Sequence, residues 1–278
     1  MSRPLVAISH GEDPRAMVHE ALERIGAAEV VRPDDVVVLK PNYVEPMLPE
    51  TGVTTDPRVI AAVVEWLQYQ GVRNITLAEG GATLERTERA FQMVGLPELA
   101  GRLGVRLVNA FRDETEEVII PRPLSLQRVR LSSTIYNATC LINLPKLKCH
   151  SMAGVTLNVK NLMGAVVPDH EIMHRELHKR LCDLATVMRA KLCVIDGLIG
   201  SERHETAGRP VKTDVIIAGT DPVATDVIGT MVMGLDPAEI EHLRLCAARG
   251  LGEGDPAKIE VVGAELERVR KKYQRGYW

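Results

Sequence analysis

Eight short apolar runs recur along the chain, separated by segments with a helical spacing of apolar residues. Runs of this length that are apolar on both faces are typical of buried parallel strands, because helices cover both sides of such a sheet. The sequence therefore predicts an α/β fold with a mostly parallel sheet and helices on both faces. The expected strands lie at 5–9, 34–42, 74–81, 105–110, 138–146, 191–197, 213–219 and 258–263.

Two segments carry clear helix signals. In the first, Asp56 and Pro57 open an amphipathic stretch that Gly71 ends, which predicts a helix over 55–70. In the second, Asp221 and Pro222 follow the expected strand 213–219 directly and predict a helix over 222–234. A strand followed by a helix thus occurs in both halves of the chain.

The region between the halves has a different pattern. Residues 116–122 and 127–137 alternate in polarity, and Pro121 and Pro123 cannot donate ladder hydrogen bonds. We therefore predict an N-terminal α/β half over 1–110, an antiparallel insertion or connection over 111–135, and a C-terminal α/β half with the Lys/His motif over 136–278. Whether the halves share one sheet is left open.

Composition narrows the function classes. The five cysteines are odd in number and widely spaced, which argues against a disulfide framework. No apolar segment approaches the roughly 20 residues of a membrane span, so we expect a cytoplasmic protein without a membrane partner. The net charge of -3 and an aromatic content of 3% argue against a nucleic-acid partner.

The most informative segment is 144–150, which we expect to be a loop after the strand ending near Asn143. Loops at the carboxyl ends of parallel strands are where ligands usually bind. Lys146 and Lys148 would project to one side if strand geometry continued, an arrangement that suits an anion, and His150 follows them. An ordinary solvated loop explains the same residues.

Lys160 and Asn161 lie in the largely apolar stretch 155–167. A buried lysine needs an anionic partner, which is either a protein carboxylate or a substrate group. If a helix begins after Ser151, as we expect, its first backbone N–H groups add a second anion-binding element.

Polar residues also follow other expected strands, and converging strand ends build one cleft. Lys40 and Asn42 follow one strand, Glu79 and Gly80 a second, and Asp196 a third. Asp226 lies one turn into the helix that opens at Asp221. We expect Asp226 to be either a buried partner of a lysine or a general acid or base.

His170, His174 and His178 are spaced four apart. On one helix, neighbouring pairs would share a face at a spacing that can hold a metal ion. A solvated polar helix face is the alternative, since the stretch is rich in charged residues.

Four segments, NLPKLKCH, AGVTLNVKNLMG, VIDG and GTDPVATDVIG, resemble the signatures of the family called domain of unknown function 362. The resemblance implies a soluble α/β domain, joined in some relatives to ferredoxin-type iron–sulfur modules, and it assigns no reaction. The stretch GLIGSERHETAGRP departs from the Gly-x-Gly-Pro-like turn of the family, which leaves Glu202 and Gly208 open. The matched positions are Lys40, Asn42, Glu79, Gly80, Lys146, Lys148, His150, Lys160, Asn161, His174, Asp196, Asp221 and Asp226.

We predict an enzyme that acts on a small anionic metabolite, a carboxylate or a phosphate. The alternatives are a metal-binding or redox module, with ligands among His150, His174, Asp196 and Cys149, and a non-catalytic anion-binding protein. The cofactor is left undefined with a metal ion as one option, and a homo-oligomer or a redox partner protein is left open. The predicted catalytic residues are His150, His174 and Asp226, and the predicted substrate-binding residues are Lys40, Asn42, Glu79, Gly80, Lys146, Lys148, Lys160, Asn161 and Asp196.

Overall fold

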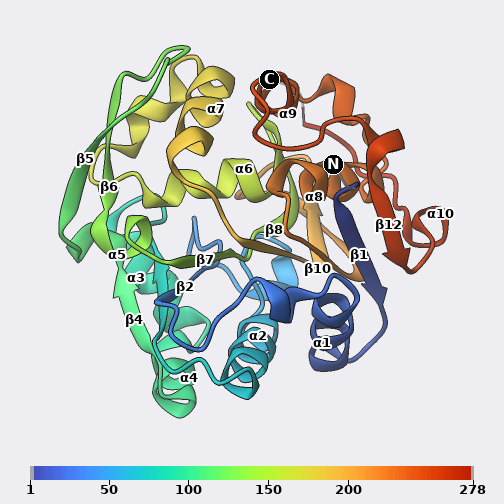
Figure 1. The fold of residues 1–278 in the computed structure, drawn as a ribbon, viewed down its shortest axis with the longest axis horizontal. Coiled ribbons are helices and arrows are strands. Elements are labelled where there is room, and N and C mark those ends of the chain that lie inside the picture. The colour runs from blue at the N-terminus through green and yellow to red at the C-terminus, as the bar shows by residue number, and fades with distance from the viewer. Residues whose placement is uncertain (1–2, 277–278) are drawn as a thin grey trace.

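A single ten-stranded sheet forms the centre of the molecule (Figure 1). The computed structural model describes residues 3–276. The strand order is β12-β1-β11-β10-β7-β2-β3-β4, with β8 paired to β10 and β9 paired to β8. The strands are β1 (Leu5–His10), β2 (Val37–Lys40), β3 (Ile75–Glu79), β4 (Arg106–Asn109), β7 (Cys140–Asn143), β8 (Lys146–His150), β9 (Gly154–Thr156), β10 (Leu192–Glu202), β11 (Arg209–Gly219) and β12 (Glu260–Gly263).

Most neighbours in this sheet are parallel. Strands β10, β7, β2, β3 and β4 run in one direction, while β11 is antiparallel to both β10 and β1. The mostly parallel α/β fold is therefore confirmed. Strands from the predicted N-terminal half pair with strands from the predicted C-terminal half at β2 and β7, and the proposed domain boundaries stay a prediction.

Helices cover both faces of the sheet, as Figure 1 shows. Along β10, Val194 packs with the helices of one face, whereas Cys193 and Ile195 pack with those of the other. This two-sided burial explains why the strands read as continuous apolar runs. One face carries α1 (Pro14–Arg24), α2 (Pro57–Tyr69), α3 (Leu84–Met93) and α4 (Leu96–Leu103), and the other carries α7 (Leu177–Val187), α8 (Pro222–Val232) and α9 (Glu241–Ala248).

The two predicted helix starts are confirmed. The Asp56 carboxylate accepts from Arg58 N at 2.9 Å and caps α2, and Asp221 caps α8 by accepting from Val223 N and Ala224 N. Gly71, at a φ of 88°, follows the end of α2. Asp221 is therefore a helix cap.

The predicted antiparallel insertion contains a separate two-stranded sheet. It pairs β5 (Thr115–Ile119) with β6 (Arg128–Ser132). Within residues 3–276, no helix is both long and apolar enough to cross a bilayer. The remaining short helices are α5 (Ser133–Tyr136), α6 (Asn158–Asn161), α10 (Leu266–Val269), and the 3-10 turns η1 (Ala27–Glu29), η2 (Pro49–Thr51), η3 (Ala110–Arg112), η4 (Leu162–Ala165), η5 (His170–His174), η6 (Pro237–Glu239) and η7 (Pro256–Lys258).

Two expectations for the motif region are wrong. Residues 146–150 are not a loop but the strand β8, which pairs with both β10 and β9. The stretch after Ser151 is not a helix: Gly154 adopts a φ of 80° and β9 pairs back on β8, as its β-branched Val155 and Thr156 favour. Met152 N and Ala153 N donate to His150 Nδ1 instead of opening a helix, and the helix α6 begins only at Asn158.

Candidate functional site

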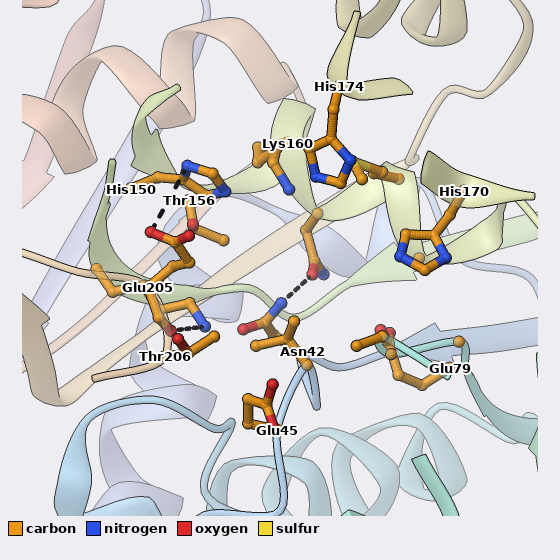
Figure 2. Close-up of a pocket in the computed structure, with 18 residues that line it drawn as sticks. Asn42, Glu45, Glu79, His150, Thr156, Lys160, His170, His174, Glu205 and Thr206 are labelled. Atoms are coloured by element: carbon orange, nitrogen blue, oxygen red, sulfur yellow. Dashed lines mark hydrogen bonds and ion pairs between the residues drawn. The ribbon is translucent and has the colours of Figure 1, made fainter. Parts of the chain in front are cut away.

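A cavity of about 220 Å³ lies beyond the carboxyl ends of β2 and β3 (Figure 2). The hairpin β8–β9, the short helix α6 and the turn η5 form its other walls. This position matches the rule that ligands bind at the carboxyl ends of parallel strands. The lining residues are Asn42, Val44, Glu45, Glu79, Gly80, Gly81, Ala82, Lys148, His150, Thr156, Lys160, Asn161, Met163, Gly164, His170, His174, Glu205 and Thr206.

Lys160 is a cation of this cavity that makes no direct ion pair within residues 3–276, although the Glu205 and Glu79 carboxylates favour its charge from a longer distance. It extends from α6 toward the cavity, and no hydrogen bond or ion pair joins its ammonium to any group within residues 3–276. Burial lowers the pKa of Lys160 to about 8, so the side chain still carries most of its charge at neutral pH. A partly buried charge without a partner is costly, and an anion in the cavity would offset that cost.

Lys148 differs from Lys160 because backbone carbonyls hold it. Its Nζ donates to Val53 O at 2.8 Å and to Glu205 O at 3.1 Å, and the side chain is fully buried. Burial, with a smaller contribution from the neighbouring Lys160 charge, lowers the pKa of Lys148 to about 7. Lys148 is therefore close to half protonated at neutral pH.

Glu79 forms an ion pair with Lys40 at the inner wall. The distance from Lys40 Nζ to Glu79 Oε2 is 2.5 Å, and both side chains are buried. Burial raises the pKa of Glu79 to about 7 and lowers the pKa of Lys40. Lys40 itself does not line the cavity, and its ammonium contacts Glu79.

Two glycines allow the backbone to pass close to this ion pair. A side chain at Gly164 would meet Glu79 Oε1 at 2.5 Å and Lys40 Nζ at 2.7 Å, and one at Gly80 would meet Gly164 O at 2.5 Å. Close packing therefore requires glycine at both Gly164 and Gly80.

His150 is held as one neutral tautomer. Its Nδ1 accepts from Met152 N at 3.1 Å and from Ala153 N at 3.2 Å, so the ring proton lies on Nε2. Burial lowers the pKa of His150 far below its usual range. As a consequence, His150 can donate a hydrogen bond in the cavity, but it is poorly suited to accept a proton there.

The expected helix through the three histidines is wrong. His170 and His174 lie on the 3-10 turn η5, whereas His178 belongs to α7. Between them, Glu176 adopts a φ of 48°, which prevents one continuous helix. His170 and His174 both line the cavity, with ring centroids 6.2 Å apart, while His178 stacks on His242. In the described part of the chain, no three His, Cys, Asp or Glu side chains are grouped so that they could hold a metal ion.

Buried carboxamides connect the cavity to the core. Asn42 Nδ2 donates to Asn161 Oδ1 at 2.7 Å, and Asn161 Nδ2 donates to Asn143 Oδ1 at 2.7 Å. Several buried atoms of the cavity wall find no hydrogen-bond partner among residues 3–276. They are Asn42 Oδ1, Thr156 Oγ1 and His170 Nδ1.

Besides Lys40, three predicted site residues lie outside the cavity lining. Lys146 and Asp196 form a fully buried ion pair at 2.7 Å, and Asp196 also accepts from Asp56 N, so both serve the core. Among residues 3–276, Asp226 pairs with no lysine, which was one of its two predicted roles; it accepts from Asn158 N and Val159 N and caps α6. Burial raises the pKa of Asp226 to about 7, but its carboxylate lies away from the cavity.

Four polar lining residues are missing from the candidates that the sequence predicts: Glu45, Thr156, Glu205 and Thr206. Glu205 falls in the stretch where the chain departs from the family pattern, and its carboxylate accepts from Ser151 N at 2.9 Å. The departure from the family pattern could have drawn attention to Glu205. The sequence around Thr156 offers no such signal, because it is an ordinary β-branched run. Cys149, one of the alternative metal ligands, is a buried thiol whose pKa burial raises to about 11.

The Glu202 and Gly208 positions left open by the sequence have structural roles. Glu202 pairs with Arg209 at 2.5 Å, and a side chain at Gly208 would meet Glu202 O at 2.2 Å. Neither residue lines the cavity.

Comparison with known proteins identifies similar chains. The thylakoid-associated protein of Synechocystis sp. (strain ATCC 27184 / PCC 6803 / Kazusa) is 29% identical over 257 residues, which is 85% of this chain and 75% of that protein. The lactate racemase apoprotein from Thermoanaerobacterium thermosaccharolyticum has a similar solved structure, with 11% identity and a TM-score of 0.41. The match covers 89% of this chain but only 57% of the lactate racemase chain. A likeness so distant says nothing about the reaction.

The family resemblance seen in the motifs has a firmer basis. The family model described as Domain of unknown function (DUF362) matches residues 37–231. The match includes β2, the hairpin β8–β9, α6 and α8, and with them every wall of the cavity. The chain therefore belongs to the DUF362 family.

Proposed function

We propose that this protein is an enzyme that binds a small carboxylate or phosphate metabolite in the cavity and moves a proton on it. The observation that carries the proposal is the Lys160 ammonium, which extends into the cavity without a hydrogen bond or ion pair to any described residue. Lysine suits this task because its ammonium is a compact charge that binds carboxylate and phosphate oxygens. A cavity of about 220 Å³ admits a small metabolite and not a drug-sized ligand.

Glu79 and Lys148 supply the acid–base part of the proposal. Both have pKa values of about 7 and both line the cavity, so each exchanges a proton readily at neutral pH. His174 stands at the exposed rim and is a second route for a proton. His150 contributes a fixed hydrogen-bond donor through Nε2.

Calorimetry on the full chain at pH 7 tests anion binding. A panel of acetate, glycolate, methyl phosphate and glycerol 3-phosphate is titrated into the wild type, Lys160→Met and Lys272→Met. Lys272 is an exposed lysine that does not line the cavity and gives a matched control. We expect Lys160→Met to weaken binding about 10-fold to 100-fold, the usual range for a hydrogen bond to a charged group. Equal binding by all three proteins would refute the proposal.

Catalysis needs a separate measurement. A ligand that binds is incubated with the protein in deuterated water, and proton exchange or conversion is followed by nuclear magnetic resonance. We expect exchange with the wild type and a loss of at least about 100-fold with Glu79→Gln, in line with general acid–base contributions. Binding without any exchange or conversion would leave a non-catalytic anion-binding protein.

A further inference from the structure

The orientation of the Asn42 side chain is fixed by the core behind it. Asn161 Nδ2 donates to Asn143 Oδ1 at 2.7 Å, to Pro41 O at 3.1 Å and to Lys40 O at 3.3 Å. Backbone carbonyls can only accept hydrogen bonds, so the amino group of Asn161 must face them. Its carbonyl oxygen consequently faces Asn42, which must donate from Nδ2 at 2.7 Å.

This arrangement leaves the Asn42 carbonyl oxygen for the cavity. Oδ1 of Asn42 has no hydrogen-bond donor among residues 3–276, although the residue is only 7% exposed and lines the cavity. Thr156, at 3% exposure, likewise has a hydroxyl without a partner among the described residues, and it also lines the cavity (Figure 2). A buried polar atom without a partner costs about 1–3 kcal/mol, so a neutral acceptor held in this way favours a ligand that donates to it.

The charges around the cavity indicate which kind of donor fits. Its three carboxylates are already engaged: Glu79 with Lys40, Glu45 with Arg86, and Glu205 with Ser151. An ammonium group binds best to a free carboxylate, and a neutral carbonyl suits a hydroxyl donor. The unpartnered hydroxyl of Thr156 adds a second neutral hydrogen-bonding group.

From this geometry, and resting on the proposed function, we infer that the substrate is a hydroxyl-bearing carboxylate or phosphate. Its anionic group contacts Lys160 and its hydroxyl donates to Asn42 Oδ1. Asn42 is thus the residue that selects for the hydroxyl, and Asn161 is the residue that positions Asn42. An anion without a hydroxyl group binds to Lys160 but leaves the carbonyl of Asn42 unpaired.

Matched ligand pairs test this inference. Glycolate is compared with acetate, and glycerol 3-phosphate with propyl phosphate, by calorimetry at pH 7 with the wild type, Asn42→Leu and Lys160→Met. We expect the wild type to bind the hydroxylated member of at least one pair about 10-fold more tightly, the effect of one net hydrogen bond. Asn42→Leu should bind both members of that pair equally, whereas Lys160→Met should weaken both by the same factor.

The outcomes separate the two levels of the argument. If no anion binds, or if Lys160→Met binds like the wild type, the proposed function fails. If anions bind through Lys160 but the wild type shows no preference within either pair, the inference fails and the proposed function stands. Glycine binding more tightly than glycolate would also overturn the inference, because the donor would then be an ammonium group. The wild-type comparison decides the matter even if Asn42→Leu does not fold.

Discussion

Lys146 and Lys160 lie in neighbouring motif segments, and they have opposite environments. Lys146 is fully buried and forms a 2.7 Å ion pair with Asp196, which is also fully buried. Lys160 faces a cavity and has no partner among the described residues. Both residues belong to the family motif, and by sequence alone they were equal candidates for binding an anion. The protein pairs one lysine directly with a carboxylate, and we propose that the other binds a ligand.

The difference follows from where each segment ends in the fold. Strand β8 continues along β10, which brings Lys146 directly beside Asp196 in the parallel register. The short helix α6 is held by Asp226 at its amino end, and it directs Lys160 into the cavity. A motif lysine can therefore be part of the fold or part of the site. The carboxylate that the topology places beside it decides which.

The largest expected effect is on the core ion pair. Lys146→Met leaves the Asp196 carboxylate buried without its cation, so we expect a loss of about 3–5 kcal/mol in the free energy of unfolding. Urea denaturation measures this loss. The double variant Lys146→Met/Asp196→Asn should lose clearly less than the sum of the two single variants, because no unpaired charge remains. If Lys146→Met were no less stable than Lys160→Met, the proposed difference between a structural lysine and a cavity lysine would be wrong.

The second prediction concerns the effect of the Lys160 charge on the free energy of unfolding. Burial depresses its folded-state pKa from the ordinary lysine value of 10.5 to about 8, so the charged form destabilises the fold at neutral pH. We expect Lys160→Met to raise the free energy of unfolding at pH 7 by about 1–3 kcal/mol. The penalty is fully present below pH 8 and disappears as the pH rises toward 10.5. The advantage of the variant should therefore shrink over that range, and an advantage that grows with pH would contradict this.

Anion affinity should also depend on the protonation of Lys160. Above its pKa of about 8 the Lys160 ammonium loses its proton, so affinity should fall about tenfold for each further pH unit. Lys160→Arg keeps its charge at these pH values and should abolish that fall, even if its absolute affinity differs. Calorimetry between pH 7.5 and pH 9.5, a range chosen to span the pKa of about 8, measures both proteins. A parallel decline in the two would assign the titration to another group.

Much of the fold could be predicted from the sequence because its signals are local. The alternating apolar runs indicated the sheet, and Asp56 and Asp221 marked helix starts that the structure confirms. The hairpin β8–β9 was missed because a positive φ at Gly154 reverses the chain inside a stretch that reads as helical. Such a turn is fixed by tertiary pairing with β10, and residue spacing does not encode that pairing.

The candidate site was only partly predictable. Asn42, Glu79, Lys148, Lys160 and other predicted residues do line the cavity, because strand ends converge at one edge of a parallel sheet. Which lysine finds a carboxylate depends on contacts between residues far apart in the sequence, as between Lys146 and Asp196. The break in the helix at Glu176, which separates the three histidines, also depends on packing and not on spacing.

The smallest expected effect compares two threonines, one satisfied by the core and one facing the cavity. Thr55 Oγ1 donates to Leu144 O and accepts from Asn42 N, both at 2.8 Å, whereas the buried hydroxyl of Thr156 has no partner among residues 3–276. Thr55→Val leaves two buried backbone groups, Asn42 N and Leu144 O, without this hydrogen-bond partner. It should therefore cost about 1–3 kcal/mol in the free energy of unfolding. Thr156→Val keeps the β-branched shape that β9 favours and removes only an unpaired hydroxyl. We therefore expect no loss and a gain of up to about 1 kcal/mol by urea denaturation. A loss at Thr156 equal to that at Thr55 would mean that this hydroxyl stabilises the fold itself, and it would remove Thr156 from the groups left for a ligand.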